Sequence, residues 1–202
     1  ELMQAPMARG GGVIITAHMG CLELSQVLAR SVPGLRVTAL VHTAHAESFN
    51  RMLKQLNPDG RFELLQVTAL DAAMATRLGE RVSRGEFVAI TGDRVPVRSG
   101  RVAFARFLGV PAPFPVGPYV LAAALGCPLY AMACIRESGR YRLRLECLAE
   151  RVVLPRGERD AALAQMAARF SDWLEARLRA APLDWFNFFP FWDQAPDESA
   201  RS

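Results

Sequence analysis

Short apolar segments that alternate with segments of helical spacing are the feature that most constrains the fold of this chain. Six segments have the length and apolar content of strands: Val13–Ile15, Leu35–Val41, Phe62–Val67, Phe87–Thr91, Pro128–Ile135 and Tyr141–Cys147. Five others are predicted to be helices: Glu23–Arg30, Glu47–Leu56, Asp71–Arg84, Tyr119–Leu125 and Asp160–Arg179. Strands that alternate with helices predict an α/β fold, with a layered, mainly parallel sheet flanked by helices.

The composition agrees with one folded domain. The 202 residues are 51% hydrophobic and 22% charged, which is enough apolar material for a sizeable core. We therefore expect a single domain over residues 1–202. No apolar stretch approaches the roughly 20 residues that span a bilayer. The first residue is Glu1 rather than Met, which leaves open a fragment that lacks an upstream anchor or partner domain.

The charged residues and cysteines limit the class of partner. The net charge is +4, and Lys54 is the only lysine, so nearly all the positive charge is arginine. Arginine suits phosphate and carboxylate groups, so an anionic lipid surface, a nucleotide-bearing cofactor and an acidic carrier protein are compatible partners. No aromatic-basic motif of a nucleic-acid-binding protein is present. The four cysteines form no C-x-x-C pair, which predicts neither a metal site nor structural disulfides.

His18 and Glu23 are the first candidates for chemistry. His18 follows the first strand, and loops at the carboxyl ends of strands carry the chemistry of open α/β sheets. On one regular helix, residues five apart would point about 140° away from each other. The two can meet only if His18 lies on the loop and Glu23 in the first helical turn. Glu23 could then hold the imidazole in one tautomer while its other nitrogen acts as a base. The alternative is a satisfied polar histidine and a glutamate that favours the helix dipole.

Three later segments add to this pattern. Gly92-Asp93-Arg94 follows a buried strand. A loop rich in Pro, Gly and Arg is predicted over Val95–Pro118, and loops of this length are usually functional. An aromatic segment, Trp185–Trp192, lies near the C-terminus. An Asp–Arg pair that caps a turn is the structural alternative for Asp93 and Arg94.

Taken in order, these segments resemble the glycerolipid acyltransferase superfamily, and most closely the bacterial late acyltransferases of lipid A biosynthesis with their relatives fused to glycosyltransferases. His18-x4-Glu23 resembles the H-x4-D/E motif, and Gly92-Asp93-Arg94 resembles the Gly-Asp-Gln/Arg element. Phe107–Pro118 is similar to the "F-x-G-x-P … P-x-G-P" stretch, and Trp185–Trp192 is similar to the aromatic C-terminal signature. The likeness extends over about residues 10 to 193.

The resemblance implies a reaction without metal or cofactor. A fatty acyl group would pass from acyl carrier protein or coenzyme A to a hydroxyl of a lipid or glycolipid. His18 would take the hydroxyl proton, and Glu23 would stabilise the imidazolium. Backbone amides near Met19-Gly20, or in the loop that holds Pro115 and Gly117, would stabilise the charge on the thioester oxygen.

The resemblance also implies binding residues. Asp93 and Arg94 would line the donor or acceptor side, with Arg94 on a phosphate or on pantetheine and Asp93 on a loop or a sugar hydroxyl. Asn50 and Arg51 would supply a second basic contact. The aromatic residues of Trp185–Trp192 would pack on the sheet, form an acyl slot or touch the membrane.

The predicted function is therefore an O-acyltransferase in the cytoplasm, peripheral to the inner membrane, that does not bind nucleic acid. A lipid- or acyl-carrier-binding module without turnover is one alternative. An acyl thioesterase, with water as acceptor, is another. A serine hydrolase is disfavoured because the chain has no G-x-S-x-G elbow.

Overall fold

The computed structural model describes residues 3–21, 32–41, 61–67, 71–96 and 101–194. Its main sheet has six strands in the order β3-β2-β4-β1-β7-β8. Their bounds are β1 Gly12–Gly20, β2 Val37–Val41, β3 Phe62–Gln66, β4 Phe87–Thr91, β7 Leu129–Glu137 and β8 Arg140–Ala149. The helices are α1 Gln4–Ala8, α4 Ala72–Ser83, α5 Gly117–Leu125 and α6 Arg159–Ala180, with 3-10 turns at Pro182–Asp184 and Phe191–Asp193.

The main sheet confirms the predicted α/β class. All neighbouring strands from β3 to β7 are parallel, and only β8 runs antiparallel, against β7. β1 lies between β4 and β7, and Val13, Ile14 and Ile15 are all buried. A strand covered on both faces reads as a continuous apolar run rather than an alternating one, which is why this segment carries three consecutive apolar residues.

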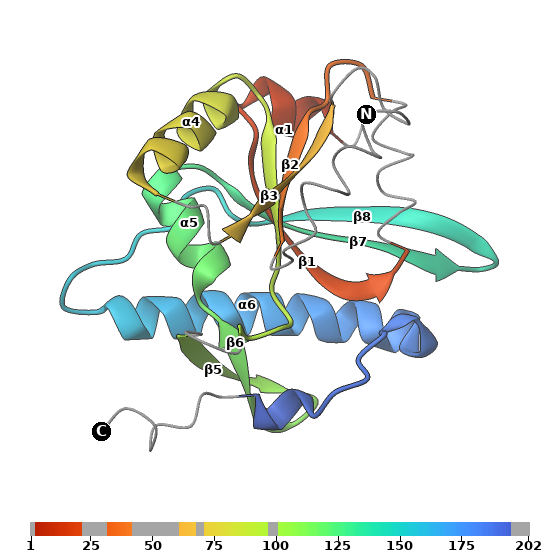
Figure 1. The fold of residues 1–202 in the computed structure, drawn as a ribbon. Coiled ribbons are helices and arrows are strands. Elements are labelled where there is room, and N and C mark those ends of the chain that lie inside the picture. Colours follow the sequence, from red (N-terminus) through yellow and green to blue (C-terminus); the bar gives the residue numbers. More distant parts are fainter. Residues whose placement is uncertain (1–2, 22–31, 42–60, 68–70, 97–100, 195–202) are drawn as a thin grey trace.

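The two faces of the sheet belong to two hydrophobic clusters. On one face, Val13 and Ile15 of β1 join a large cluster with residues of α4, α5 and α6. On the other face, Ile14, Phe87 and Tyr130 pack in a smaller cluster with Met3. Figure 1 shows α6 crossing beside the sheet, with contacts to β7 and β8 on one side and to β5 on the other. This packing makes a layered molecule.

The predicted loop Val95–Pro118 is wrong over most of its length. It contains an antiparallel hairpin of β5 (Val102–Phe107) and β6 (Val110–Pro115), and α5 begins at Gly117. The connection is two residues, Leu108 and Gly109, with φ of 51° and 87°, as a type I′ hairpin turn requires. β6 was not predicted because it contains three prolines, Pro111, Pro113 and Pro115, which are rare in strands. They recur at every second position of β6, so their missing N–H groups all lie on one side, where an edge strand needs no partner.

Most other predicted elements lie within a few residues of the observed ones. The prediction for β4 is correct at both ends, and the ends of α4 and α6 each differ from the predicted ends by one residue. The predicted helices Glu23–Arg30 and Glu47–Leu56 fall outside the described residues. One boundary matters for function: β1 continues to Gly20, so His18 lies in the strand and not on a loop after it. Within the described ranges, no helix has both the length and the apolar character needed to cross a bilayer.

Candidate active site

His18 lies near the carboxyl end of β1, where the pairing with β7 becomes irregular. Thr16 pairs with Met132 and Gly20 with Cys134, so four steps along β1 match two along β7. Such a bulge redirects side chains locally. The His18 side chain is 32% exposed, while Ala17 and Met19 on either side are buried. The imidazole is therefore held by the strand and still open to a substrate.

Asp93 provides the carboxylate that contacts His18. His18 Nδ1 lies 2.9 Å from Asp93 Oδ1, and the His18 backbone N–H donates to Asp93 Oδ2 at 2.8 Å. Asp93 follows β4, the parallel neighbour of β1, so both residues come to the same edge of the sheet. Its side chain is 0% exposed. Because a carboxylate only accepts, Nδ1 carries the proton in this pair, and Nε2 is left as the basic nitrogen.

This geometry changes the expected role of Asp93. The sequence predicted contact with a loop or a sugar hydroxyl, and a capped turn was the alternative. Instead the carboxylate is buried and its oxygens are directed at His18. The predicted partner of His18, Glu23, lies outside the described residues.

The C-terminal segment closes over the His18–Asp93 pair. Trp185 pairs with Met19 in an antiparallel bridge, and the Phe186 N–H donates to the His18 carbonyl at 2.8 Å. The Trp185 indole N–H donates to Asp93 Oδ2 at 3.3 Å. Trp185 thus contacts both the strand that carries His18 and the carboxylate that orients it.

A second C-terminal residue holds the loop after Asp93. The Gln194 side chain donates to the Asp93 carbonyl at 3.4 Å and accepts from the Val95 N–H at 2.9 Å. Sequence reasoning missed the roles of both Trp185 and Gln194. The aromatic signature pointed to the Trp185 region, but nothing in the sequence indicated Gln194.

An aromatic cluster joins the β5–β6 hairpin to this segment. The Phe107 ring centroid lies 5.4 Å from that of Trp185, 5.3 Å from Phe191 and 6.1 Å from Trp192. Phe107 and Phe191 are buried. Four segments that are distant in the sequence, those of His18, Asp93, Phe107 and Trp185, therefore meet at one edge of the sheet.

Residues 1–194 match the model of a protein family described as bacterial lipid A biosynthesis acyltransferase. The chain belongs to this family. It is therefore an acyltransferase that transfers an acyl group to a lipid. No curated protein matches the chain. The residues assembled around His18 are thus the candidate active site of a lipid A biosynthesis acyltransferase.

Arg94 lies at the exposed rim of this acyltransferase site. Its guanidinium carbon is 4.6 Å from the centroid of the Phe189 ring, a cation–π contact, while the preceding Asp93 is buried. Of these two adjacent residues, Asp93 places its carboxylate inside the protein and Arg94 places its guanidinium at the surface. The expected contact of Arg94 with a phosphate or with pantetheine stays a prediction.

The structure also describes three other predicted site residues, Gly20, Pro115 and Gly117. Gly20 has φ of +69°, and a Cβ built there would lie 1.9 Å from the Cys134 carbonyl oxygen, so it permits the close approach of β1 and β7. Pro115 is buried at the end of β6, and Gly117 begins α5. Among the described contacts, neither one hydrogen-bonds to His18 or Asp93. Asn50 and Arg51 lie outside the described residues.

The aromatic segment divides into packed and exposed residues. Phe191 is buried, and Trp185 and Phe189 pack against the main cluster, as the packing interpretation predicts. In contrast, Phe186 and Phe188 are 48% and 88% exposed, and nearby Leu183 is 90% exposed. The acyltransferase therefore presents apolar side chains to solvent on the segment that is hydrogen-bonded to the His18 backbone.

Proposed function

We propose that this acyltransferase moves a fatty acyl group from an acyl thioester to a hydroxyl of a lipid or glycolipid, with His18 as the general base. The donor would be an acyl carrier protein or coenzyme A, and the residues act without a metal or cofactor. The observation that supports this most strongly is the 2.9 Å contact between His18 Nδ1 and the buried carboxylate of Asp93.

The reaction follows from the chemistry of the pair. Nε2 of His18 takes the proton of the acceptor hydroxyl as its oxygen attacks the thioester carbonyl. The tetrahedral intermediate then collapses, its C–S bond breaks, and the departing thiolate takes the proton from the imidazolium. Asp93 stabilises the imidazolium between these steps, because its charge lies against Nδ1. Positioned base catalysis of this kind is worth about 10²–10⁴-fold.

Glu23 would supply a second carboxylate to the site. It follows the end of β1 by three residues, which keeps it close in the chain to His18. Glu23 would be a second carboxylate partner that stabilises the imidazolium of His18, as the H-x4-D/E resemblance implies. Backbone amides at Gly20, or beside Pro115 and Gly117, would be the donors to the thioester oxygen.

Arg94 would bind a phosphate of the donor or the acceptor. Its exposed guanidinium beside the site favours this, since arginine matches phosphate oxygens with two parallel hydrogen bonds. Asn50 and Arg51 would add a second polar contact.

The exposed side chains of Leu183, Phe186 and Phe188 support a peripheral contact with the cytoplasmic face of the inner membrane. Exposed apolar groups that lie together mark membrane or protein interaction sites. Contact at this place would bring a lipid acceptor to His18, since Phe186 is hydrogen-bonded to the His18 backbone.

The experiment measures release of free thiol from acyl-carrier-protein and acyl-coenzyme A donors, with and without a bacterial lipid extract. The wild type is compared with His18→Ala and Asp93→Asn. Each substitution is expected to lower kcat by about 10²–10⁴-fold, because one removes the base and the other its charged partner. Asp160→Asn is the matched control, since Asp160 is exposed at the start of α6 and pairs only with Arg101 in the described residues.

The outcomes separate the candidate functions. Acceptor-dependent release that disappears in His18→Ala supports acyl transfer and identifies the donor. Release without an acceptor would instead indicate a thioesterase, and donor binding without release would indicate a non-catalytic module. Glu23→Gln, measured in the same assay, tests whether the second carboxylate acts at all. Equal rates for the wild type and His18→Ala would refute the assignment of the base.

A further inference from the structure

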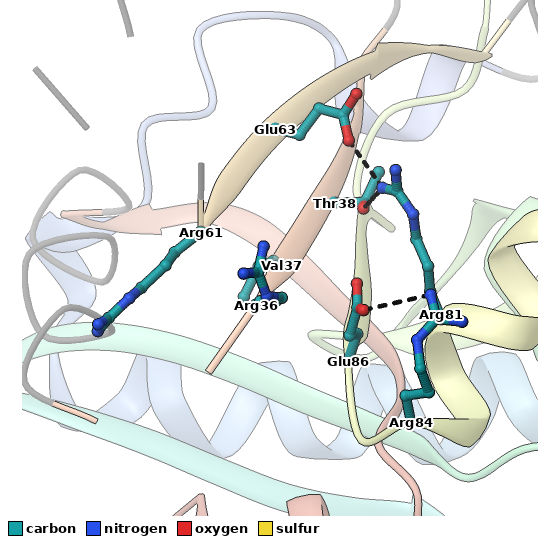
Figure 2. Close-up of a pocket in the computed structure, with 8 residues that line it drawn as sticks. All are labelled: Arg36, Val37, Thr38, Arg61, Glu63, Arg81, Arg84 and Glu86. Carbon is teal, nitrogen blue, oxygen red and sulfur yellow. Dashed lines mark hydrogen bonds and ion pairs between the residues drawn. The ribbon is translucent and has the colours of Figure 1, made fainter. Parts of the chain in front are cut away.

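A polar pocket lies at the edge of the main sheet opposite to His18. Figure 2 shows the side chains that surround it, at the amino ends of β2, β3 and β4 and beneath the last turn of α4. Its volume is about 250 Å³. The residues that line it are Arg36, Val37, Thr38, Arg61, Glu63, Arg81, Arg84 and Glu86.

The pocket carries excess positive charge. Four arginines and two glutamates line it, and each glutamate is paired with one arginine, Glu63 with Arg81 and Glu86 with Arg84. Arginines at the C-terminal end of a helix are favoured by its dipole, which accounts for Arg81 in the last turn of α4 and for Arg84 at its C-cap. Arg36 lies immediately before β2, so the helix dipole does not explain its position.

Arg81 is fixed at the inner wall of this pocket. Its Nη1 donates to the hydroxyl of buried Thr38 at 2.8 Å and to Glu63 at 2.7 Å. Thr38 and Glu63 are cross-strand partners in β2 and β3, so the sheet positions both acceptors together. Both bonds use Nη1, so among the residues that the structure describes the N–H groups of Nη2 and Nε are left for another acceptor.

Two further arginines lie at the mouth of the pocket. Arg36 is exposed, and within the described part of the chain its guanidinium has no hydrogen-bond or ion-pair partner. Arg84 reaches Glu86 only at 3.5 Å, a long ion pair between partly exposed groups. Such a pair is weak in water and can open to a competing anion. Figure 2 shows Arg84 paired with Glu86 and Arg36 at the start of β2, while the side chain of Arg61 is directed away from the other arginines.

The pocket is distinct from the acyltransferase site. Glu86 of the pocket precedes β4 and Asp93 of the active site follows it, so the length of β4 gives the distance between the two sites. Seven residues of extended chain at roughly 3.3 Å each give about 23 Å between them. A small ligand in the pocket therefore cannot touch His18 or Asp93.

We propose that this pocket binds an anion of the phosphate class, either a free phosphate compound or the phosphate of a lipid headgroup. Guanidinium groups match phosphate oxygens in charge and in geometry. Val37 is the one apolar residue of the lining, which is unsuited to an acyl chain. The volume is below the 300–1,000 Å³ usual for larger organic ligands, which favours a group of the size of a phosphate or a sugar phosphate.

The test measures binding of inorganic phosphate to the full chain by calorimetry at constant ionic strength. Arg36→Gln removes an exposed donor without disturbing the core, and it is expected to weaken phosphate binding about tenfold. Arg9→Gln is the control, since Arg9 is an exposed arginine paired with Glu150 at 2.8 Å, outside the pocket. Arg84→Gln is the second pocket variant if Arg36→Gln does not fold.

A second arm identifies the source of the phosphate group. Binding to phosphatidylcholine vesicles with and without phosphatidate is measured for the same variants. Loss of the phosphatidate-dependent binding in Arg36→Gln indicates a lipid headgroup, while an effect on inorganic phosphate alone indicates a soluble ligand. The proposal is overturned if neither probe binds, or if Arg9→Gln weakens binding as much as Arg36→Gln. Neither arm uses acyl transfer, so failure here leaves the proposed function unaffected.

Discussion

At the scale of single residues, Asp93 is held in the candidate active site by three hydrogen bonds. Its buried carboxylate accepts from the His18 backbone, from His18 Nδ1 and from the Trp185 indole. A buried charge is costly unless several donors surround it, and here they come from two distant parts of the chain. The hydrogen bonds from His18 that stabilise the buried charge of Asp93 also fix the orientation of the His18 imidazole.

Tyr119 in α5 is a second buried polar residue, but without a partner. Its hydroxyl has no hydrogen-bond partner in the described residues, and its side chain is fully buried. We expect Tyr119→Phe to raise the free energy of unfolding by about 1–3 kcal/mol, because an unsatisfied buried group is removed. Urea unfolding measures this change, and a lower midpoint for the variant would contradict it.

The same residue predicts a dependence on alkaline pH. Burial raises the pKa of the Tyr119 phenol well above its ordinary value of 10.0. Between these two pKa values the unfolded chain loses the proton and the folded chain keeps it, so the free energy of unfolding falls as pH rises above about 10. The decrease from this residue is at most about 1.4 kcal/mol per pH unit, and Tyr119→Phe should lack it. Parallel curves for wild type and variant above pH 10 would exclude this contribution.

At the scale of elements, Gly20 allows β1 and β7 to pair beside His18. A methyl group there would meet the Cys134 carbonyl oxygen at 1.9 Å, in a backbone with φ of +69°. We expect Gly20→Ala to destabilise the fold by more than about 2 kcal/mol, since a left-handed conformation alone costs about 1–2 kcal/mol for a residue with a side chain.

Gly139 provides the matched control for that prediction. It has φ of +79° in the turn between β7 and β8, with nothing within 4 Å of a built Cβ. Gly139→Ala therefore carries the conformational cost without the clash. Urea unfolding of both variants isolates the contribution of the close approach. Equal losses would show that β1 and β7 do not depend on the glycine for their spacing.

At the scale of the whole molecule, the active-site edge carries exposed apolar side chains and the opposite edge carries the arginine pocket. We expect Phe188→Ser to weaken binding to phospholipid vesicles by about tenfold or more, because burial of a phenylalanine contributes about 1.5–3 kcal/mol. Val153→Ser is the control, since Val153 is also exposed but lies before α6, beyond the far end of β8. Co-sedimentation with vesicles measures both, and equal losses would contradict a contact through this edge.

Much of the secondary structure could be predicted from the sequence, because its signals are local. The buried runs of β1 and β4 and the apolar spacing of α6 each lie within one segment. The motifs around His18, Asp93 and Trp185 also indicated the family, which the match over residues 1–194 bears out. The hairpin of β5 and β6 was missed, because prolines at alternate positions remove the usual strand signal and are tolerated only at an edge.

The partner of His18 depended on the order of the strands. The sequence predicted Glu23, five residues away, as a partner of His18, and this stays a prediction because Glu23 lies outside the described residues. The contact that the structure describes, with Asp93, spans 75 residues. That contact exists because β1 and β4 are parallel neighbours and because Trp185 and Gln194 return to hold Asp93. Periodicity reports which face of an element is apolar, but it carries no information about which strand lies beside which. Local motifs in the sequence therefore indicated the family and its type of reaction. The contact between His18 and Asp93 was decided only by the tertiary structure, because it depends on which strands are neighbours.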